Sequence, residues 1–336
     1  MTKRERVTAA LRGEPVDRVP VATWVHFPRR DGNPVDESKS ILDYQRTYDW
    51  DFIKLMMRST TQLEDWGLQT GDYHPEGYLL TTRYAINAPE DWTKLKVLDP
   101  HKGSLGQALE TIRLVKKNST EDVFKLATIF SPFMIARMLA WWGRESEVTI
   151  DLDAIRTELH AALEVFTETD IRYAKACLEN GADGIYFAES SATTDFMTER
   201  QFHEFIDPYD RRILDALEGK SSFTMLHICS EHIMFDKFLD YPVHALNWSD
   251  RTTPPTLKEA RTKTDKCLSG GLAGGGHLNA PLVAGTPKDV EREAREAFGM
   301  AGSRKFLLTT GCSTAVMAKP ENLHAFRSIA DKMKGT

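Results

Sequence analysis

The chain has 336 residues, of which 41% are hydrophobic and 27% are charged, a composition typical of a large globular protein. Its formal net charge of −6, with no block of Lys and Arg residues, argues against nucleic acid as a partner. The longest apolar runs are too short to span a bilayer, and no apolar signal-peptide core follows the charged N-terminus, so we expect no membrane partner and a cytoplasmic location.

Short apolar runs rich in β-branched residues alternate with longer amphipathic stretches, which indicates parallel strands joined by helices. Eight strands are predicted, at residues 19–25, 52–56, 124–129, 184–187, 223–227, 245–247, 267–270 and 305–309. The clearest helical patterns cover residues 155–179, 198–217, 288–298 and 321–333. The long segment 71–117 is irregular, and we expect it to carry an inserted hairpin with residues 78–84 as one arm.

Eight strands that alternate with helices predict an α/β protein with a closed (β/α)₈ TIM barrel. An open sheet of six or seven strands is the alternative that the pattern leaves open. Barrels of this kind often exceed 200 residues as one unit, so we expect residues 1–336 to form a single domain. Within it, the start of the chain is predicted to be a helical extension and residues 71–117 an insertion.

The side chains best suited to chemistry lie at or just after the ends of the predicted strands. These residues are His26, Ser131, Glu189, His227, Cys229, Asn247, Asp250 and Cys312, together with the glycine-rich loop 270–276. In a barrel the carboxyl ends of all strands meet at one face, where active sites are built. The fold and the site are therefore predicted together.

The sharpest pattern is His227-Ile-Cys229 together with the distant Cys312. Alternate residues of a strand point to the same side, so His227 and Cys229 can bind one ion, and Cys312 can reach it from another strand end. One nitrogen and two thiolates suit zinc, and three protein ligands leave a position open for water or substrate. The spacing also fits two buried cysteines and a hydrogen-bonded histidine. The remaining cysteines, Cys177 and Cys267, lie in apolar patterns typical of a core.

Several segments resemble the uroporphyrinogen decarboxylase superfamily. The opening RVTAALRG at residues 6–13 and DRVPV at 17–21 are similar to the start of that family, and residues 130–133, 190–195 and 285–287 match later loops. The resemblance covers the whole chain and implies the same barrel fold.

Two branches of this superfamily differ at the residues that concern the site. True uroporphyrinogen decarboxylases have Arg-Gln-Ala-Gly-Arg after the first strand, where this chain has His26-Phe-Pro-Arg29-Arg30, although Arg29 and Arg30 remain candidates for binding an anionic substrate. The other branch, the zinc-dependent corrinoid methyltransferases such as the corrinoid:coenzyme M enzymes, is marked by His-x-Cys and a distant Cys. The resemblance therefore implies a zinc site at His227, Cys229 and Cys312.

The resemblance also implies methyl transfer with a corrinoid (cobalamin) cofactor. No Asp-x-His-x-x-Gly cobalamin motif is present, so the corrinoid is expected on a separate partner protein. A small thiol is the favoured methyl acceptor, because a site with two thiolates suits a soft ligand. Demethylation of a methyl ether or thioether, decarboxylation without a metal, and non-catalytic binding of a corrinoid or tetrapyrrole remain as alternatives. Barrel enzymes often dimerise, and a homodimer is left open.

Further roles are assigned to residues around the predicted mouth of the barrel. Candidate catalytic residues are Glu189, His277 and His26, and candidate substrate-binding residues are Arg29, Arg30, Ser131 and Asn247. For Glu189 three roles are left open: a fourth metal ligand, a base, or a hydrogen-bonded carboxylate at a strand end. His26 is a proton donor or a packed side chain, and His277 contacts substrate or is solvated on its loop.

Overall fold

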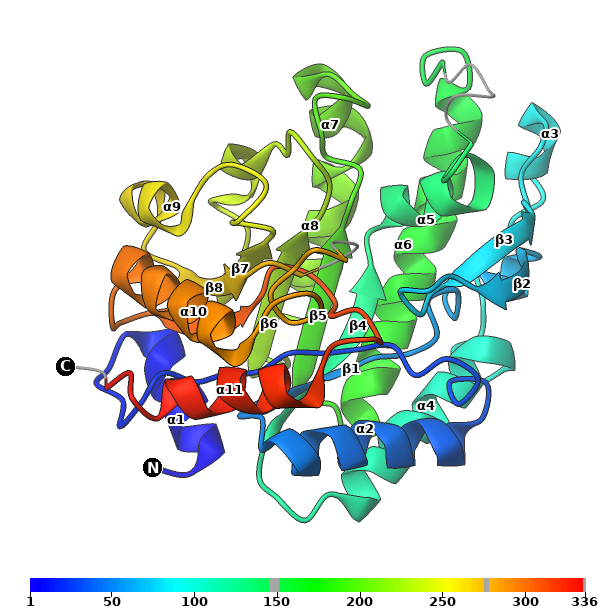
Figure 1. The fold of residues 1–336 in the computed structure, drawn as a ribbon. Helices are drawn as coiled ribbons and strands as arrows, with labels where there is room; N and C mark the ends of the chain where they lie inside the picture. The colour runs from blue at the N-terminus through cyan, green and yellow to red at the C-terminus, as the bar shows by residue number, and fades with distance from the viewer. Residues whose placement is uncertain (145–150, 275–277, 335–336) are drawn as a thin grey trace.

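The computed structural model describes residues 1–144, 151–274 and 278–334. A seven-stranded parallel sheet, in the order β1-β4-β5-β6-β7-β8-β9, curls through the centre of the molecule, with helices on its outer side (Figure 1). Its strands are β1 (Phe52–Leu55), β4 (Phe124–Phe130), β5 (Gly184–Glu189), β6 (Phe223–Ile228), β7 (Ala245–Trp248), β8 (Cys267–Leu272) and β9 (Phe306–Thr310). Each corresponds to a predicted strand, and the predicted barrel class is confirmed.

The first predicted strand, residues 19–25, occupies the gap between β9 and β1. It forms isolated parallel bridges from Val21 to Leu308 and from Val25 to Thr314, without a continuous ladder. On its other side, the amide of Asp51 donates to the carbonyl of Val21 at 2.9 Å. The eighth position of the barrel is therefore filled by an irregular segment.

Eleven α-helices are found in the described residues. They are α1 (Lys3–Arg12), α2 (Pro34–Tyr48), α3 (Pro89–Trp92), α4 (Gly103–Asn118), α5 (Pro132–Ala140), α6 (Arg156–Glu179), α7 (Glu199–Phe205), α8 (Asp207–Ala216), α9 (Leu257–Lys263), α10 (Pro287–Ala301) and α11 (Pro320–Ala330). Short 3₁₀ turns cover Glu64–Trp66 and Phe235–Phe238. The single helix predicted over 198–217 is two helices that meet at Ile206, because Pro208 has no amide to donate to the carbonyl four residues earlier and its ring crowds that carbonyl. None of the described helices is long and apolar enough to cross a membrane.

The predicted insertion contains an antiparallel hairpin, β2 (Gln69–Tyr73) and β3 (Leu79–Arg83). Its turn packs against the carboxyl end of the barrel. A Cβ atom added to Gly77, which has a φ of +99°, would lie 2.8 Å from Cβ of His26 and 2.6 Å from Cγ1 of Val316. Only glycine fits there, so the hairpin rests directly on the segments that follow the first strand and β9.

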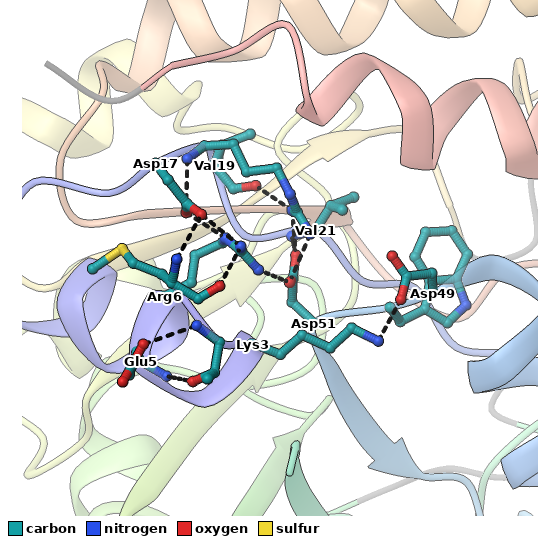
Figure 2. A network of polar contacts seen from close by, with 12 residues as sticks. Lys3, Glu5, Arg6, Asp17, Val19, Val21, Asp49 and Asp51 are labelled. Atoms are coloured by element: carbon teal, nitrogen blue, oxygen red, sulfur yellow. Dashed lines mark hydrogen bonds and ion pairs between the residues drawn. The ribbon is translucent and has the colours of Figure 1, made fainter. Parts of the chain in front are cut away.

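At the opposite end of the barrel, a buried ionic network holds the first predicted strand, residues 19–25, in place (Figure 2). Asp51 is fully buried and accepts hydrogen bonds from Arg6 at 2.7 Å, from Arg18 at 2.6 Å and from the amide of Val21 at 2.8 Å. Arg6 also pairs with Asp17 at 2.6 Å. The RVTAALRG and DRVPV segments thus supply the residues that join α1 and the first strand to the start of β1.

Candidate metal centre

Three side chains meet at the carboxyl end of the barrel. His227 lies on β6, Cys229 follows the same strand, and Cys312 follows β9. One ligand atom from each lies within 4.8 Å of the other two, so the three side chains could hold one metal ion. In the part of the chain that the structure describes, no other three His, Cys, Asp or Glu side chains come this close.

The backbone around each thiol explains this convergence. The amide of Cys229 donates to the carbonyl of Glu189 at 2.8 Å, which extends the β5–β6 pairing by one residue. Beside Cys312, a Cβ added to Gly311 would lie 2.6 Å from Cα of Ser249 and 2.8 Å from the carbonyl oxygen of Trp248. Glycine at this position lets the loop after β9 approach the end of β7 closely, which brings Cys312 towards His227.

A hydrogen bond fixes the ring of His227. Its Nδ1 lies 2.7 Å from Oδ1 of Asn247, whose Nδ2 donates to the carbonyls of Ser269 at 2.9 Å and Thr310 at 3.1 Å. Because the amide nitrogen is committed to acceptors, the amide oxygen must face His227 and accept its Nδ1 proton. This arrangement leaves Nε2 as the atom with a free lone pair, as is usual for a metal-binding histidine.

The two thiols of the triad differ in pKa. Contact with Cys229 and the nearby His227 hold the pKa of Cys312 well below the usual range for a thiol. The same contact with Cys312, with burial added, raises the pKa of Cys229. The thiolate is the form that binds metal, so the lowered pKa of Cys312 favours binding, whereas Cys229 would have to lose its proton to become a ligand. One imidazole and two sulfurs form a donor set that fits zinc.

Glu189 and Ser131 lie close to each other and on the other side of the sheet from the triad. Ala188 pairs with His227 in the β5–β6 register, so Glu189, one residue further, points to the opposite face. Its carboxylate accepts hydrogen bonds from the hydroxyl of Ser131 and from the amides of Ser191 and Ala192, the last at 2.9 Å. Both side chains thus have hydrogen-bond partners away from the triad. Their proposed contacts with metal or substrate stay predictions.

Of the remaining predicted residues, His26, Arg29, Arg30 and Asn247 lie in the part of the chain that the structure describes. Burial and the positive charge of Lys54 lower the pKa of His26 to about 3, so this histidine is neutral at physiological pH. Arg29 and Arg30 are exposed in the turn before α2. His277 lies outside the described residues. Asn247 is fully buried beneath the triad, where it contacts His227.

Two interior residues were missed by the sequence argument. Tyr186 on β5 stacks on the ring of His227, with 5.3 Å between centroids, and its hydroxyl donates to Oδ1 of Asn247 at 3.2 Å. Lys54 on β1 places Nζ 4.5 Å from the centroid of the Tyr186 ring. The available signal was a lysine inside the otherwise apolar strand Phe52–Met56.

Comparison with known proteins agrees with this architecture. Methylcobamide:CoM methyltransferase MtbA of Methanosarcina acetivorans is 23% identical over 99% of this chain and 98% of its own. The uroporphyrinogen decarboxylase of a Synechococcus species is 21% identical over 98% and 94% of the two chains. A solved methyltransferase structure from Methanosarcina mazei superposes with a TM-score of 0.83 at 22% identity, covering 99% of each chain. Residues 2–333 match the family model described as uroporphyrinogen decarboxylase (URO-D), and the chain belongs to this family.

Proposed function

We propose that the protein is a zinc-dependent methyltransferase that moves a methyl group between a corrinoid on a separate protein and a small thiol. The observation that carries this proposal is the meeting of His227, Cys229 and Cys312, with the ring of His227 held by Asn247. A decarboxylase that works without a metal has no need of such a group. The homology to methylcobamide:CoM methyltransferases, which extends over nearly the whole chain, supports the same assignment.

The residues of this chain fit distinct parts of that reaction. Three protein ligands leave one position open for the substrate sulfur, and bound zinc would favour the thiolate form of that sulfur at neutral pH. The thiolates of Cys229 and Cys312 would balance the charge of a divalent ion, which would keep the substrate sulfur nucleophilic. Asn247 accepts the Nδ1 proton of His227, so Nε2 is the atom that the ring would offer to the ion.

The test is a methyl-transfer assay on purified, zinc-analysed protein. Free methylcobalamin is offered with a panel of small thiols, and methyl ethers and thioethers are offered in parallel with reduced cobalamin. Methylation of a thiol by protein containing about one zinc per chain supports the proposal. Turnover confined to the ether or thioether arm would instead assign demethylation. Metal-free, folded protein that decarboxylates a porphyrinogen would refute zinc-dependent methyl transfer.

A further inference from the structure

A small cavity lies between α2, α4 and the segment that follows β1, away from the triad of the candidate metal centre. Its volume is about 10 Å³, which is room for one particle the size of a water molecule. Six of the side chains that line it carry oxygen atoms: Asp31, Glu37, Thr61, Ser104, Gln107 and Thr111. No histidine or cysteine of the described residues lines it. The cavity is therefore rich in oxygen donors.

Two carboxylate oxygens at this cavity have no partner. Asp31 is 6% exposed, and its Oδ1 accepts a hydrogen bond from the hydroxyl of Tyr73, but no group in the described residues bonds to its Oδ2. Glu37 is 3% exposed, and its Oε2 accepts from Thr111 at 2.7 Å, whereas its Oε1 is likewise without a partner. Burying such an oxygen costs free energy. Because both residues line the cavity, one ligand inside it could contact both oxygens.

The charges around the cavity favour a divalent cation. Arg58 also lines it, but its guanidinium bonds to both carboxylate oxygens of Glu64, at 2.7 and 2.6 Å, and this pair is neutral as a whole. Asp31 and Glu37 therefore leave two negative charges when both are ionised. Burial raises the pKa of Glu37 to about 8 and also raises the pKa of Asp31, so a cation would have to displace the proton of Glu37 at neutral pH. Tyr173 on α6 also faces Glu37, and burial raises its pKa too, so this phenol stays neutral.

We propose that this cavity binds a hard divalent cation, Ca²⁺ in preference to Mg²⁺, with Asp31 and Glu37 as its carboxylate ligands. Oxygen atoms are the ligands that both ions take, whereas nitrogen and sulfur ligands are those of the candidate zinc site. Mg²⁺ gives up its water shell reluctantly, and a cavity with room for one water molecule cannot hold that shell. The inference does not depend on the proposed methyl transfer.

Such an ion would join segments that lie far apart in the sequence. Asp31 belongs to the turn before α2 and bonds to Tyr73 on β2 of the inserted hairpin. Glu37 belongs to α2 and bonds to Thr111 on α4. The ion would connect the turn to α2 directly, and the two carboxylates would connect it to the hairpin and to α4. Its binding should therefore stabilise the folded protein.

The experiment measures cation binding to zinc-loaded protein in buffer that has been freed of other divalent ions. CaCl₂, MgCl₂ and NaCl are added at matched ionic strength at pH 8, and calorimetric binding and the melting temperature are both recorded. The variants are Glu37→Gln and Asp31→Asn, each of which removes one negative charge with little change in shape. The matched control is Asp43→Asn, which removes an exposed carboxylate from the same helix α2.

We expect the wild type to bind one Ca²⁺ per chain with a dissociation constant below about 1 mM, and to melt at a higher temperature when Ca²⁺ is present. Mg²⁺ should bind at least about tenfold more weakly than Ca²⁺. Ca²⁺ should also bind more weakly at pH 6 than at pH 8, because it then competes with the proton of Glu37. Both cavity variants should lose at least about tenfold in Ca²⁺ affinity, whereas Asp43→Asn should bind as the wild type does.

Two results would overturn the inference. One is a wild-type protein that binds neither divalent ion under these conditions, which would mean that the cavity holds at most a water molecule. The other is Ca²⁺ binding that persists unchanged in both Glu37→Gln and Asp31→Asn. Tighter binding of Mg²⁺ than of Ca²⁺ would refute the choice of ion. The melting curves also show whether a variant is folded, and if one of the two is not, the other decides.

Discussion

Oδ1 of Asn247 lies 2.7 Å from Nδ1 of His227, and the same amide donates through Nδ2 to the carbonyls of Ser269 and Thr310. One buried side chain on β7 thus connects a candidate ligand on β6 to the backbone of β8 and β9. The ring of His227 is oriented by the sheet as a whole.

Replacing Asn247 should therefore weaken metal binding. We expect Asn247→Ala to lower zinc affinity about 10- to 100-fold, because the Nδ1 proton of His227 loses its acceptor and the ring is free to rotate. The measurement is a competitive zinc titration against a chromophoric chelator. Asn247→Asp keeps an acceptor and should bind more tightly than the alanine variant. Equal zinc affinity in all three proteins would show that this hydrogen bond does not position the ligand.

Removing one sulfur should abolish the centre without unfolding the barrel. Cys312→Ala is expected to lose bound zinc and methyl transfer, while its melting temperature stays close to that of the metal-free wild type. The matched control is Cys267→Ala on β8, where burial raises the pKa of the thiol to about 12 and the side chain serves the core. Metal analysis and the methyl-transfer assay check both. A fully active Cys312→Ala protein would eliminate the role proposed for this residue.

The ionic network at the other end of the barrel should govern stability. Asp51→Ala leaves Arg6 and Arg18 without their shared buried partner and is expected to cost about 3–5 kcal/mol in the free energy of unfolding. Urea denaturation followed by circular dichroism measures this loss. Glu14→Ala, at an exposed acidic residue of the same region, should change stability by less than about 0.5 kcal/mol. Similar losses in both variants would contradict the importance of burial.

Because the carboxyl group of Glu37 on α2 is buried, we expect the stability of the protein to decline with rising pH. Glu37 is 3% exposed, its Oε2 accepts a hydrogen bond from Thr111 at 2.7 Å, and burial raises its pKa to about 8. The folded protein therefore keeps a proton that the unfolded chain releases near pH 4.3. The contribution of Glu37 to the free energy of unfolding is thus fully present below that pH and is lost as the pH rises towards 8.

Glu37→Gln should remove this dependence, because an amide resembles the protonated acid in shape and does not ionise. At pH 8 we expect the variant to be more stable than the wild type by roughly a few kcal/mol, with little difference at pH 4. Urea unfolding at several pH values measures this, with Glu218→Gln as an exposed control. Parallel curves for the wild type and Glu37→Gln would disprove the raised pKa.

The order and type of the barrel strands were predictable because strand patterns are local, whereas the helix α4 (Gly103–Asn118) lies in a segment that was expected to be irregular. All seven strands of the sheet lie within predicted segments or extend them by a residue or two, and the hairpin arm at 79–83 was also expected. The first strand has the same apolar pattern but forms only isolated bridges. Its contacts are with Asp51 and with β9, and no local sequence pattern encodes those distant contacts.

The side of the sheet to which a strand-end residue points was harder to predict. Glu189 directly follows Ala188, whose partner in the register is His227, so a difference of one residue turns its carboxylate away from the triad. Asn247 was expected to contact substrate, whereas its amide is used to hold His227. Lys54 was overlooked because a single lysine in an apolar strand gives no indication of what surrounds it.

The bridge between Val21 and Leu308 joins segments that the ribosome makes far apart in time. Residues 19–25 must wait for β9 before their second neighbour exists, and Cys312 emerges only after that strand. An incomplete nascent chain can therefore present His227 and Cys229 but not the third sulfur. Tight retention of a metal would mark a polypeptide that has closed its barrel, and quality control could distinguish such molecules from unfinished ones by that property alone.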